Sequence, residues 1–479
     1  MQKISPYKHY IIALLVGLAT VIFFRPGEYL TGQGILVLAV LLSTLYLWVT
    51  NHTDWVSMLM FAALIITGIL PFVAVWHQSW GNQIIAMILI CMVLNNILSK
   101  CGVIEKVARW FVTRKFVEGR PRMFIVMFAF SGFLLGIFMQ ATVLLIIFIT
   151  IAESFLREMG YKKGDKFYTA VMLTLLWNSS LSAVSTPFST SLPLIMMDAV
   201  YASHGVSVSW GQWIAIGVPW SFIMFALGAF VVCFLMKDLD TSKFDNYNVE
   251  HAKKNSPPLS KEGRIASIVA ILVVFAWIFP EIARPFSPEA AAWVSSLGFA
   301  VPPIIGVAFL CMIRVGNKPI ANYTEMTKNI PIGVLGFIGA VIVFGNALNH
   351  GDAGIIAQLR HVLGPVTSQM SPMVIVIIAI IGSLILTKFI SNTVTMLLFV
   401  HITLPLIVGS DLSLPAVTVL IGLAASLGAL LPSSNVMAPV MFGPEHITFA
   451  NTWKHNLIFL LLAYIPTLVL FYVANALLA

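Results

Sequence analysis

Three short polar residues, Ser391, Asn392 and Thr393, interrupt the apolar stretch of residues 372–408. An asparagine side chain offers an oxygen to a cation and an amide group to an anion, and the flanking hydroxyls add donors and acceptors. In apolar surroundings this triplet predicts a site that binds an ion together with an anionic substrate. Lys388, about one helical turn earlier, either attracts an anion, stands in for a cation, or extends to the surface.

Further polar breaks interrupt other apolar stretches. Ser185, Thr186 and Pro187 break residues 167–200, whereas Ser433, Ser434 and Asn435 break residues 414–442, and Thr142 lies within residues 123–155. Proline frees a backbone carbonyl, and carbonyls with hydroxyls suit a hard cation such as sodium, whereas helix N-termini favour anionic groups. Hydroxylated residues also serve helix packing, but four clusters at matched places favour binding of a carboxylate substrate with a coupling cation.

The elements that hold these residues must lie in a bilayer. Apolar residues make up 59% of the 479 positions and charged residues only 10%, which is typical of a membrane protein. Several apolar stretches approach the roughly 20 residues that cross a hydrocarbon core, and they are too long and unpatterned for barrel strands. Since every backbone amide in lipid needs an internal partner, we expect an all-α polytopic membrane protein.

Charge and cysteine content argue against a nucleic-acid-binding protein and against a disulfide-bonded or zinc-binding protein. The net charge of +8 lies in short loops between apolar segments, so it indicates topology rather than nucleic-acid binding. The four cysteines form no CxxC pair and have no histidine at ligand spacing, so neither disulfides nor structural zinc is expected. No nucleophile or metal constellation lies within the apolar segments, so the chain is not expected to be an enzyme.

Two long apolar stretches are expected to be re-entrant hairpins. The loops at residues 100–122 and 157–166 are both basic, so both should be cytoplasmic. The intervening residues 123–155 are too long for one crossing, and an entry and return keeps both loops on one side. Residues 372–408 form a similarly long apolar stretch, so we expect a second hairpin there, which enters the membrane from the outside.

Spacing supports two inverted repeats. Thr142 lies 58 residues after Ile84, and Thr393 lies 62 residues after Pro331. The opposite entry of the hairpins then predicts opposite orientation of the halves. We expect about 11 transmembrane helices and two hairpins, with a cytoplasmic N-terminus and an outside C-terminus. The expected parts are N-terminal helices (1–82), a first repeat (83–236), a cytoplasmic linker (237–264), connecting helices (265–329, with spans at 265–279 and 290–313) and a second repeat (330–479).

The motifs resemble the divalent anion sodium symporter family, the dicarboxylate, citrate and sulfate carriers of the ion-transporter superfamily. That family has a Ser-Asn-Thr triplet at each hairpin tip. The second triplet is intact as Ser391-Asn392-Thr393, whereas the first reads Gln140-Ala141-Thr142. The family's Gly-Thr-Pro-Pro-Asn-like loops correspond to Ser185-Thr186-Pro187-Phe188-Ser189 and to Ser433-Ser434-Asn435-Val436-Met437.

The resemblance implies a role for each motif. Each hairpin would form a sodium site with its partner loop, from Gln140 and Ser185 in the first half and from Ser391, Asn392, Ser433 and Ser434 in the second. Substrate carboxylates would lie between the triplets, near Thr142, Thr186, Pro187, Ser391, Asn392, Thr393 and Asn435. Because the first triplet lacks its asparagine, sodium is expected more at the second site than at the first. The resemblance also implies scaffold and mobile transport domains, with residues 1–82 in the scaffold, a homodimer, and an elevator-type movement.

The predicted function is sodium-coupled transport of di- or tricarboxylates, or of a related divalent anion, across the cell membrane. The altered first triplet and Lys388 keep open a sodium-independent anion exchanger. Loss of motifs also leaves open a membrane sensor that binds substrate without transporting it.

Overall fold

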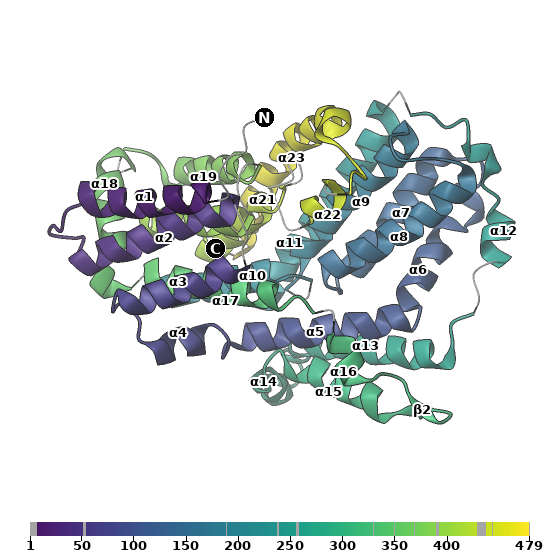
Figure 1. Ribbon diagram of the computed structural model, residues 1–479, viewed down its shortest axis with the longest axis horizontal. Coiled ribbons are helices and arrows are strands. Elements are labelled where there is room, and N and C mark those ends of the chain that lie inside the picture. Colours follow the sequence, from purple (N-terminus) through teal and green to yellow (C-terminus); the bar gives the residue numbers. More distant parts are fainter. Residues whose placement is uncertain are drawn as a thin grey trace.

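The structure, a computed structural model, describes the chain except for residues 1–6, 51–53, 188, 237–238, 255–257, 329, 349, 368, 389–391, 429–436, 443 and 479. Helices account for nearly all regular structure in the described residues, and one two-stranded ribbon is their sheet (Figure 1). The expected helical class is therefore confirmed.

The N-terminal part forms four helices, α1 (Lys8–Phe23), α2 (Gly32–Thr50), α3 (Asp54–Ile66) and α4 (Phe72–Gln78). An apolar run at residues 55–70 favours one longer helix, but α3 ends at Ile66. The chain turns there because Gly68 has a φ of +76°, which glycine adopts without steric cost. Pro71 then precedes the first residue of α4.

The residue before α2 is hydrogen-bonded to η4 (Gly351–Ala353), a single helical turn that lies far along the chain. The Thr31 hydroxyl donates to the Asp352 carbonyl at 2.6 Å, and the Thr31 amide donates to the Ala353 carbonyl at 3.3 Å. Gly34 permits this approach, because a Cβ at that position would stand 1.9 Å from the Ala353 oxygen. The N-terminal helices are therefore fixed directly to the second half.

Residues 83–236 form a second group of helices. Asn82 begins the group, since its side chain accepts a hydrogen bond from the amide of Ile84 at 2.9 Å, a typical helix start. Two helices occupy the segment expected to be the first hairpin, and another pair flanks Thr186. The elements are α5 (Gln83–Lys100), α6 (Val103–Val112), η1 (Lys115–Val117), α7 (Pro121–Gly136), α8 (Ala141–Met159), α9 (Lys166–Ser185), α10 (Ser191–His204), α11 (Trp210–Phe230) and the π-helical turn η2 (Val231–Leu235).

The connecting part contains one element that differs from the predicted straight span at 290–313. That segment is two helices bent by 69°, because Gly298 takes a φ of +80° between them and prolines open the second helix, where they are tolerated. The elements are η3 (Phe244–Asn246), α12 (Val249–Lys254), α13 (Lys261–Ala283), α14 (Pro288–Ser296), α15 (Val301–Met312), β1 (Arg314–Val315), β2 (Lys318–Pro319) and α16 (Tyr323–Thr327). Figure 1 shows α14 to α16 below α5 and α13.

The C-terminal part again contains two helices in the predicted hairpin segment. The loop expected outside, between Leu348 and Pro372, also carries a helix, α18. Besides η4, the elements are α17 (Ile332–Leu348), α18 (Ile355–Thr367), α19 (Pro372–Leu386), α20 (Asn392–Ile407), α21 (Leu414–Ala425), α22 (Ala438–Phe442) and α23 (Phe449–Leu478).

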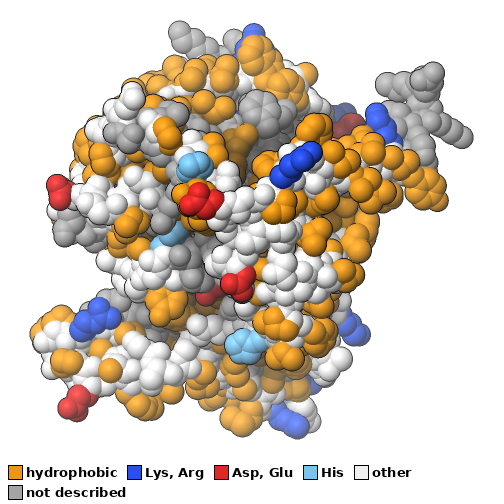
Figure 2. Space-filling view, turned by 90° about the vertical axis from the view of Figure 1, so that its left-hand side faces the viewer, with side chains coloured by type: hydrophobic (Ala, Val, Ile, Leu, Met, Phe, Trp, Pro, Cys, Tyr) orange, Lys and Arg blue, Asp and Glu red, His pale blue; other side chains and the backbone are white. Residues whose placement is uncertain are grey.

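Several helices are long and apolar enough to cross a membrane. Five described helices meet this condition by length and composition, and the bent pair α14 and α15 counts as a sixth. Shorter apolar helices include α7, α19 and α20. Large apolar side chains such as Leu14, Ile271 and Ile465 are exposed, and Figure 2 shows hydrophobic atoms over much of one face. Such a surface is suited to lipid rather than water.

The helices pack into two similar groups around a shared centre. α7 and α8 pack against α9, while α19 and α20 pack against α21. α11 contacts α9, α21 and α23, so it joins the two groups, and α10 contacts α20 and α21. The end of α7, the end of α9 and the start of α20 are thereby placed in the interior.

Candidate functional site

The junction between α7 and α8 is docked on the break that follows α9. The Thr186 hydroxyl donates to the Ile137 carbonyl, and the Ser189 hydroxyl donates to the Gly136 carbonyl at 2.5 Å. In return, the Ala141 amide donates to the Ser189 carbonyl at 3.3 Å. The hydroxyls satisfy carbonyls at the end of α7 that have no helical partner.

Gly136 lets α7 approach α9 closely. A Cβ at Gly136 would stand 2.2 Å from the Ser182 hydroxyl oxygen, well inside van der Waals contact. Both residues are buried. The position of this junction therefore depends on the absence of a side chain at residue 136.

The predicted residues of the first half all lie at this break, with different contacts. The Ser185 hydroxyl donates to the Ser182 carbonyl at 2.7 Å within α9, and Pro187 is buried beside it. Gln140 is partly buried at the junction, and Thr142 is the second residue of α8. The Thr142 side chain lies outside the described part of the chain.

The second junction uses a threonine in a similar way. The Thr387 hydroxyl donates to the Ala425 carbonyl at the end of α21 and lies 2.7 Å from Asn392 Oδ1, so its single hydrogen serves one oxygen at a time. The Asn392 amide group points at the Ser426 carbonyl, 3.4 Å away. Asn392 and the neighbouring Thr393 are both buried. The start of α20 is thereby held against the end of α21.

Lys388 also points at the end of α21. It is 5% exposed, and its ammonium group donates to the Leu427 carbonyl. The possibility that Lys388 extends to the surface is therefore wrong. A lysine at the carbonyl end of a helix occupies the kind of position that suits a cation.

The remaining predicted residues lie outside the described residues. These are Ser391, which precedes Asn392 in the sequence, and Ser433, Ser434 and Asn435, which precede α22 in the sequence.

Sequence reasoning missed two residues that build the two junctions, Thr387 and Trp213, and it named Ser189 in the first loop without giving it a role. Ser189 and Thr387 stand one or two residues from predicted site positions, and each is a hydroxyl beside an apolar helix end. Trp213 gives no signal in the sequence because its role depends on tertiary contacts.

Trp213 lies between the two junctions. Its indole nitrogen donates to the Val184 carbonyl of α9 at 2.8 Å, and it is 1% exposed. A Cβ at Gly422 of α21 would stand 2.8 Å from the ring edge of Trp213. One side chain therefore contacts the final turns of both α9 and α21.

The arrangement offers helix ends of both signs. The first turns of α8 and α20 have amide groups without helical partners. The last carbonyls of α9 and α21 also lack helical partners and accept hydrogen bonds from side chains, among them Trp213 at the end of α9 and Thr387 at the end of α21. Amides favour anions and carbonyls favour cations. Among the described residues no group of three His, Cys, Asp or Glu side chains could hold a metal ion, so any cation here would depend on carbonyl, hydroxyl and amide oxygens.

A separate polar cluster connects α8, α9 and the segment before α23. The Tyr168 hydroxyl donates to Glu153 Oε1 at 3.1 Å and lies 2.8 Å from His446 Nδ1. Lys163 lies 3.9 Å from Glu153 and donates to the Pro444 carbonyl at 3.2 Å. Burial and then the Lys163 charge lower the pKa of His446, against a partial rise due to Glu153.

Known proteins of similar sequence match most of the chain. It is 24% identical over 478 residues to the sodium-dependent dicarboxylate transporter SdcS of Staphylococcus saprophyticus, covering 92% of this chain and 87% of that protein. It is 22% identical over 460 residues to SdcS of Staphylococcus aureus strain USA300, covering 91% and 85%.

Two solved structures share the fold. The YdaH transporter of Alcanivorax borkumensis matches with a TM-score of 0.55 and 12% identity, over 92% of this chain and 98% of that chain. MtrF of Neisseria gonorrhoeae, from a class of antimetabolite efflux pumps, matches with a TM-score of 0.55 and 12% identity, over 98% and 94%.

A family model described as citrate transporter matches residues 36–402. Together with the SdcS relatives, this match confirms the expected kinship with divalent anion sodium symporters. It also identifies the chain as a transporter and not an enzyme. By a match that covers most of its length, the chain belongs to the citrate transporter family.

Proposed function

We propose that this protein is a secondary active transporter that couples the movement of small di- or tricarboxylates to sodium. Membership of a carboxylate transporter family supports the substrate class. The relatives named sodium-dependent dicarboxylate transporters support the coupling ion.

One structural observation carries the proposal: each half docks a helix junction on the end of a broken helix through a threonine hydroxyl. Thr186 bonds to Ile137 in the first half, and Thr387 bonds to Ala425 in the second. The threonine lies after α9 in the first half and at the hairpin junction in the second, so what the halves share is the docking of a hairpin junction on a helix end. This shared docking supports inverted repeats whose broken helices bind substrate and ion near the midplane.

In this proposal the substrate carboxylates lie between the two junctions, near Thr186 and Asn392. The substrate site also includes Thr142, Pro187, Ser391, Thr393 and Asn435, while sodium binds near Gln140 and Ser185 and near Ser391, Asn392, Ser433 and Ser434. The two junctions would move by an elevator-type mechanism against residues 1–82 and 265–329. In this proposal the protein is a homodimer with a cytoplasmic N-terminus.

A sodium-independent exchanger is the second candidate, and Lys388 favours it. Its ammonium group already lies at the carbonyl end of α21, where the second sodium is otherwise placed. A positive charge on Lys388 would remove the need for an added cation there.

Uptake of labelled succinate or citrate into proteoliposomes tests the proposal. We expect uptake driven by an inward sodium gradient and lost when choline replaces sodium. Uptake that is the same with and without a sodium gradient but requires succinate inside the vesicles would contradict symport and establish exchange.

A further inference from the structure

The segment between α5 and α7 lies at one end of two apolar helices. α5 ends at Lys100 and is long and apolar enough to cross a bilayer, and α7 begins at Pro121 and is a shorter apolar helix. The chain between them forms α6 and η1, next to the right-hand end of α5 in Figure 1. These residues therefore lie close to the level where the hydrocarbon core meets water. The structure describes all of residues 100–122.

α6 has one buried side and one exposed side. Ile104, Ala108 and Val112 are 0% exposed, and residues four apart lie on the same side of a helix. The helix packs on α7 and α8, the two helices of the first predicted hairpin. Trp110, on the opposite side, is 50% exposed. A short amphipathic helix at the end of membrane helices is typical of one that lies along the membrane surface.

The turn after α6 is compact and fixed in position. The Val117 amide donates to the Arg114 carbonyl at 2.9 Å, and the Arg120 amide donates to the Val117 carbonyl at 3.0 Å. Val117 is fully buried, whereas the neighbouring Phe116 is 47% exposed, and η1 packs on α7. The exposed Phe116 ring is therefore carried by a well-anchored backbone.

Three basic side chains belong to the same turn. Arg114 stacks on Trp110, with 3.5 Å between its guanidinium carbon and the ring centroid. Its Nε donates to the Trp110 carbonyl at 3.0 Å, which leaves its other N–H groups as donors. Lys115 and Arg120 are exposed and make no ion pair within the described part of the chain.

The acids of the segment offset only part of this charge. Glu118 is the acid of residues 113–120, which leaves these residues a net charge of 3 − 1 = +2. Glu105 Oε1 accepts from Arg109 Nε at 2.9 Å, so this pair is neutral as a whole. Excess positive charge beside exposed aromatic rings is typical of a surface that meets an anionic membrane.

We propose that α6 and η1 form a binding surface for anionic phospholipid head groups. Arg114, Lys115 and Arg120 bind the phosphate oxygens, and the rings of Trp110 and Phe116 enter the boundary between head groups and acyl chains. In the proposed topology this surface faces the cytoplasmic leaflet, where anionic lipids create a negative potential. The inference goes beyond the proposed transport function, because the bound lipid is not the transported substrate.

Lipid bound to this surface would act on the first junction. α6 packs on α7 and α8, and α7 ends at Gly136, whose carbonyl accepts from the Ser189 hydroxyl at 2.5 Å. A head group held by α6 and η1 keeps this helix pair at the depth of the membrane surface. An anionic bilayer should therefore favour one position of the junction over another.

Purified full-length protein in detergent allows lipid binding to be measured directly. Phosphatidylglycerol or phosphatidylcholine is titrated, and the retained lipid is counted by native mass spectrometry. The triple variant Arg114→Gln/Lys115→Gln/Arg120→Gln removes the three charges of the turn. Phe116→Ser removes one of the two exposed rings.

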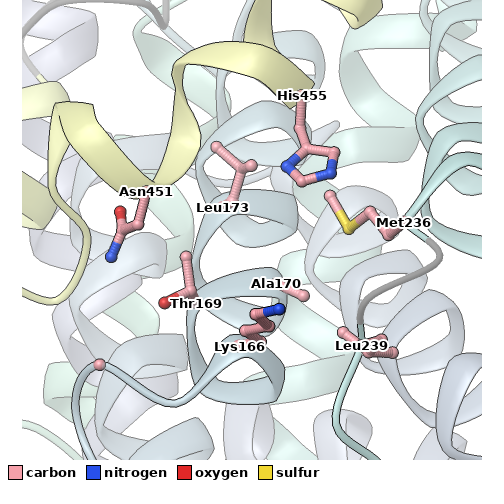
Figure 3. Close-up of a pocket in the computed structure, with 9 residues that line it drawn as sticks. Lys166, Thr169, Ala170, Leu173, Met236, Leu239, Asn451 and His455 are labelled. Carbon is pink, nitrogen blue, oxygen red and sulfur yellow. The ribbon is translucent and has the colours of Figure 1, made fainter.

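A matched control removes three charges from the next basic loop. It is the triple variant Arg157→Gln/Lys162→Gln/Lys166→Gln, which changes the net charge by the same amount. Figure 3 shows Lys166 beside a cavity of about 240 Å³ between α9 and α23, whose described lining contains no residue of α6 or η1. The control therefore separates the proposed surface from basic loops in general.

We expect the wild type to retain phosphatidylglycerol in preference to phosphatidylcholine, and added salt should weaken this retention because it screens charge. In the triple variant of the turn, half-saturation should require roughly 100-fold more phosphatidylglycerol, as expected for three charges near the head groups. The control variant should stay close to the wild type. Phe116→Ser should reduce the retention of both lipids.

The inference is overturned if the wild type retains both lipids equally, or if the two triple variants lose phosphatidylglycerol to the same extent. Stabilisation by inorganic phosphate at constant ionic strength, without a response to phosphatidylglycerol, would assign the charges to a soluble anion and overturn it as well. If the triple variant does not fold, Lys115→Gln replaces it, with an expected loss of about fivefold; wild-type retention in Lys115→Gln then contradicts the surface. Failure of uptake in proteoliposomes would contradict only the proposed function.

Discussion

The indole nitrogen of Trp213 donates a hydrogen bond to the Val184 carbonyl at 2.8 Å. Val184 stands two residues before Thr186, and the opposite edge of the Trp213 ring meets Gly422 near the end of α21. The ends of α9 and α21 are therefore positioned relative to each other by one side chain of α11.

Replacement of Trp213 by Phe should lower both stability and transport. The change removes one hydrogen bond and leaves the Val184 carbonyl without a donor, at a cost of about 1–3 kcal/mol. Trp220→Phe is the matched control, because that indole donates to Thr467 at 3.1 Å away from the junctions. We expect similar losses of melting temperature but a larger loss of uptake for Trp213→Phe. Equal uptake by the two variants would argue against a role for Trp213 in positioning the site.

Gly136→Ala should disrupt the first junction. The added Cβ would lie 2.2 Å from the Ser182 oxygen, and overpacking of this kind costs about 1–3 kcal/mol. Thermal unfolding and uptake in the single variant, and in the double variant with Ser182→Gly, test the cause. The second substitution should restore part of the loss. Gly27→Ala is the control, since nothing lies within 4 Å of the added Cβ; a comparable loss there would contradict the steric explanation.

Asn392→Ala should abolish substrate uptake while the protein still reaches the membrane. It removes the contacts of Asn392 with Thr387 and Ser426 together with its proposed contacts to substrate and ion, so we expect a loss of roughly 100-fold. Thr387→Val should reduce uptake less, and Thr387→Ser, which keeps the hydroxyl, should retain most of it. Normal transport by Asn392→Ala would remove Asn392 from the proposed site.

Lys388→Asn should increase the dependence of transport on sodium. Without the ammonium group, the carbonyl end of α21 needs another cation, so uptake should rise more steeply with sodium concentration. Lys388→Arg retains the charge and should keep the original slope. Initial rates across a sodium series measure the effect, and an unchanged slope in Lys388→Asn would show that the lysine does not replace an ion.

Acidification should destabilise the contact of His446 with Tyr168. The folded-state pKa of His446 lies below its ordinary value of 6.5, so the unfolded chain binds a proton more readily. This contribution to stability is complete above about pH 6.5 and declines as the pH falls through the folded-state pKa. Melting temperatures at pH 7.5 and 5.5 should therefore differ less in His446→Gln than in the wild type. Parallel pH profiles would contradict this assignment.

The sequence was most informative where the lipid environment imposes a simple rule. Apolar length located α7 with α8 and α19 with α20, and Pro187 marked the break between α9 and α10. The bend between α14 and α15 was missed because it depends on the backbone conformation of one glycine, Gly298. α18 was missed because residues 351–371 lack a long apolar run.

At the site, residue type predicted which segments matter better than it predicted their contacts. Thr186 and Asn392 were found because polar groups in apolar helices are costly unless they have partners. The contributions of Ser189, Thr387 and Trp213 depend on which carbonyls the packing brings near them, and no local pattern encodes that. The roles of Ser391 and Asn435 stay predictions.

The hydrogen bond between Thr31 and Asp352 has a consequence for biosynthesis. The two residues are 321 positions apart, and at about 5–20 residues per second the ribosome needs roughly a quarter of a minute to a minute to make the intervening chain. During that interval α2 has been made, whereas the η4 turn that bonds to its start has not. A nascent chain that stalls before Gly354 therefore lacks this connection, and its N-terminal helices are joined to the second half through the packing of α2, α3 and α4 on α17.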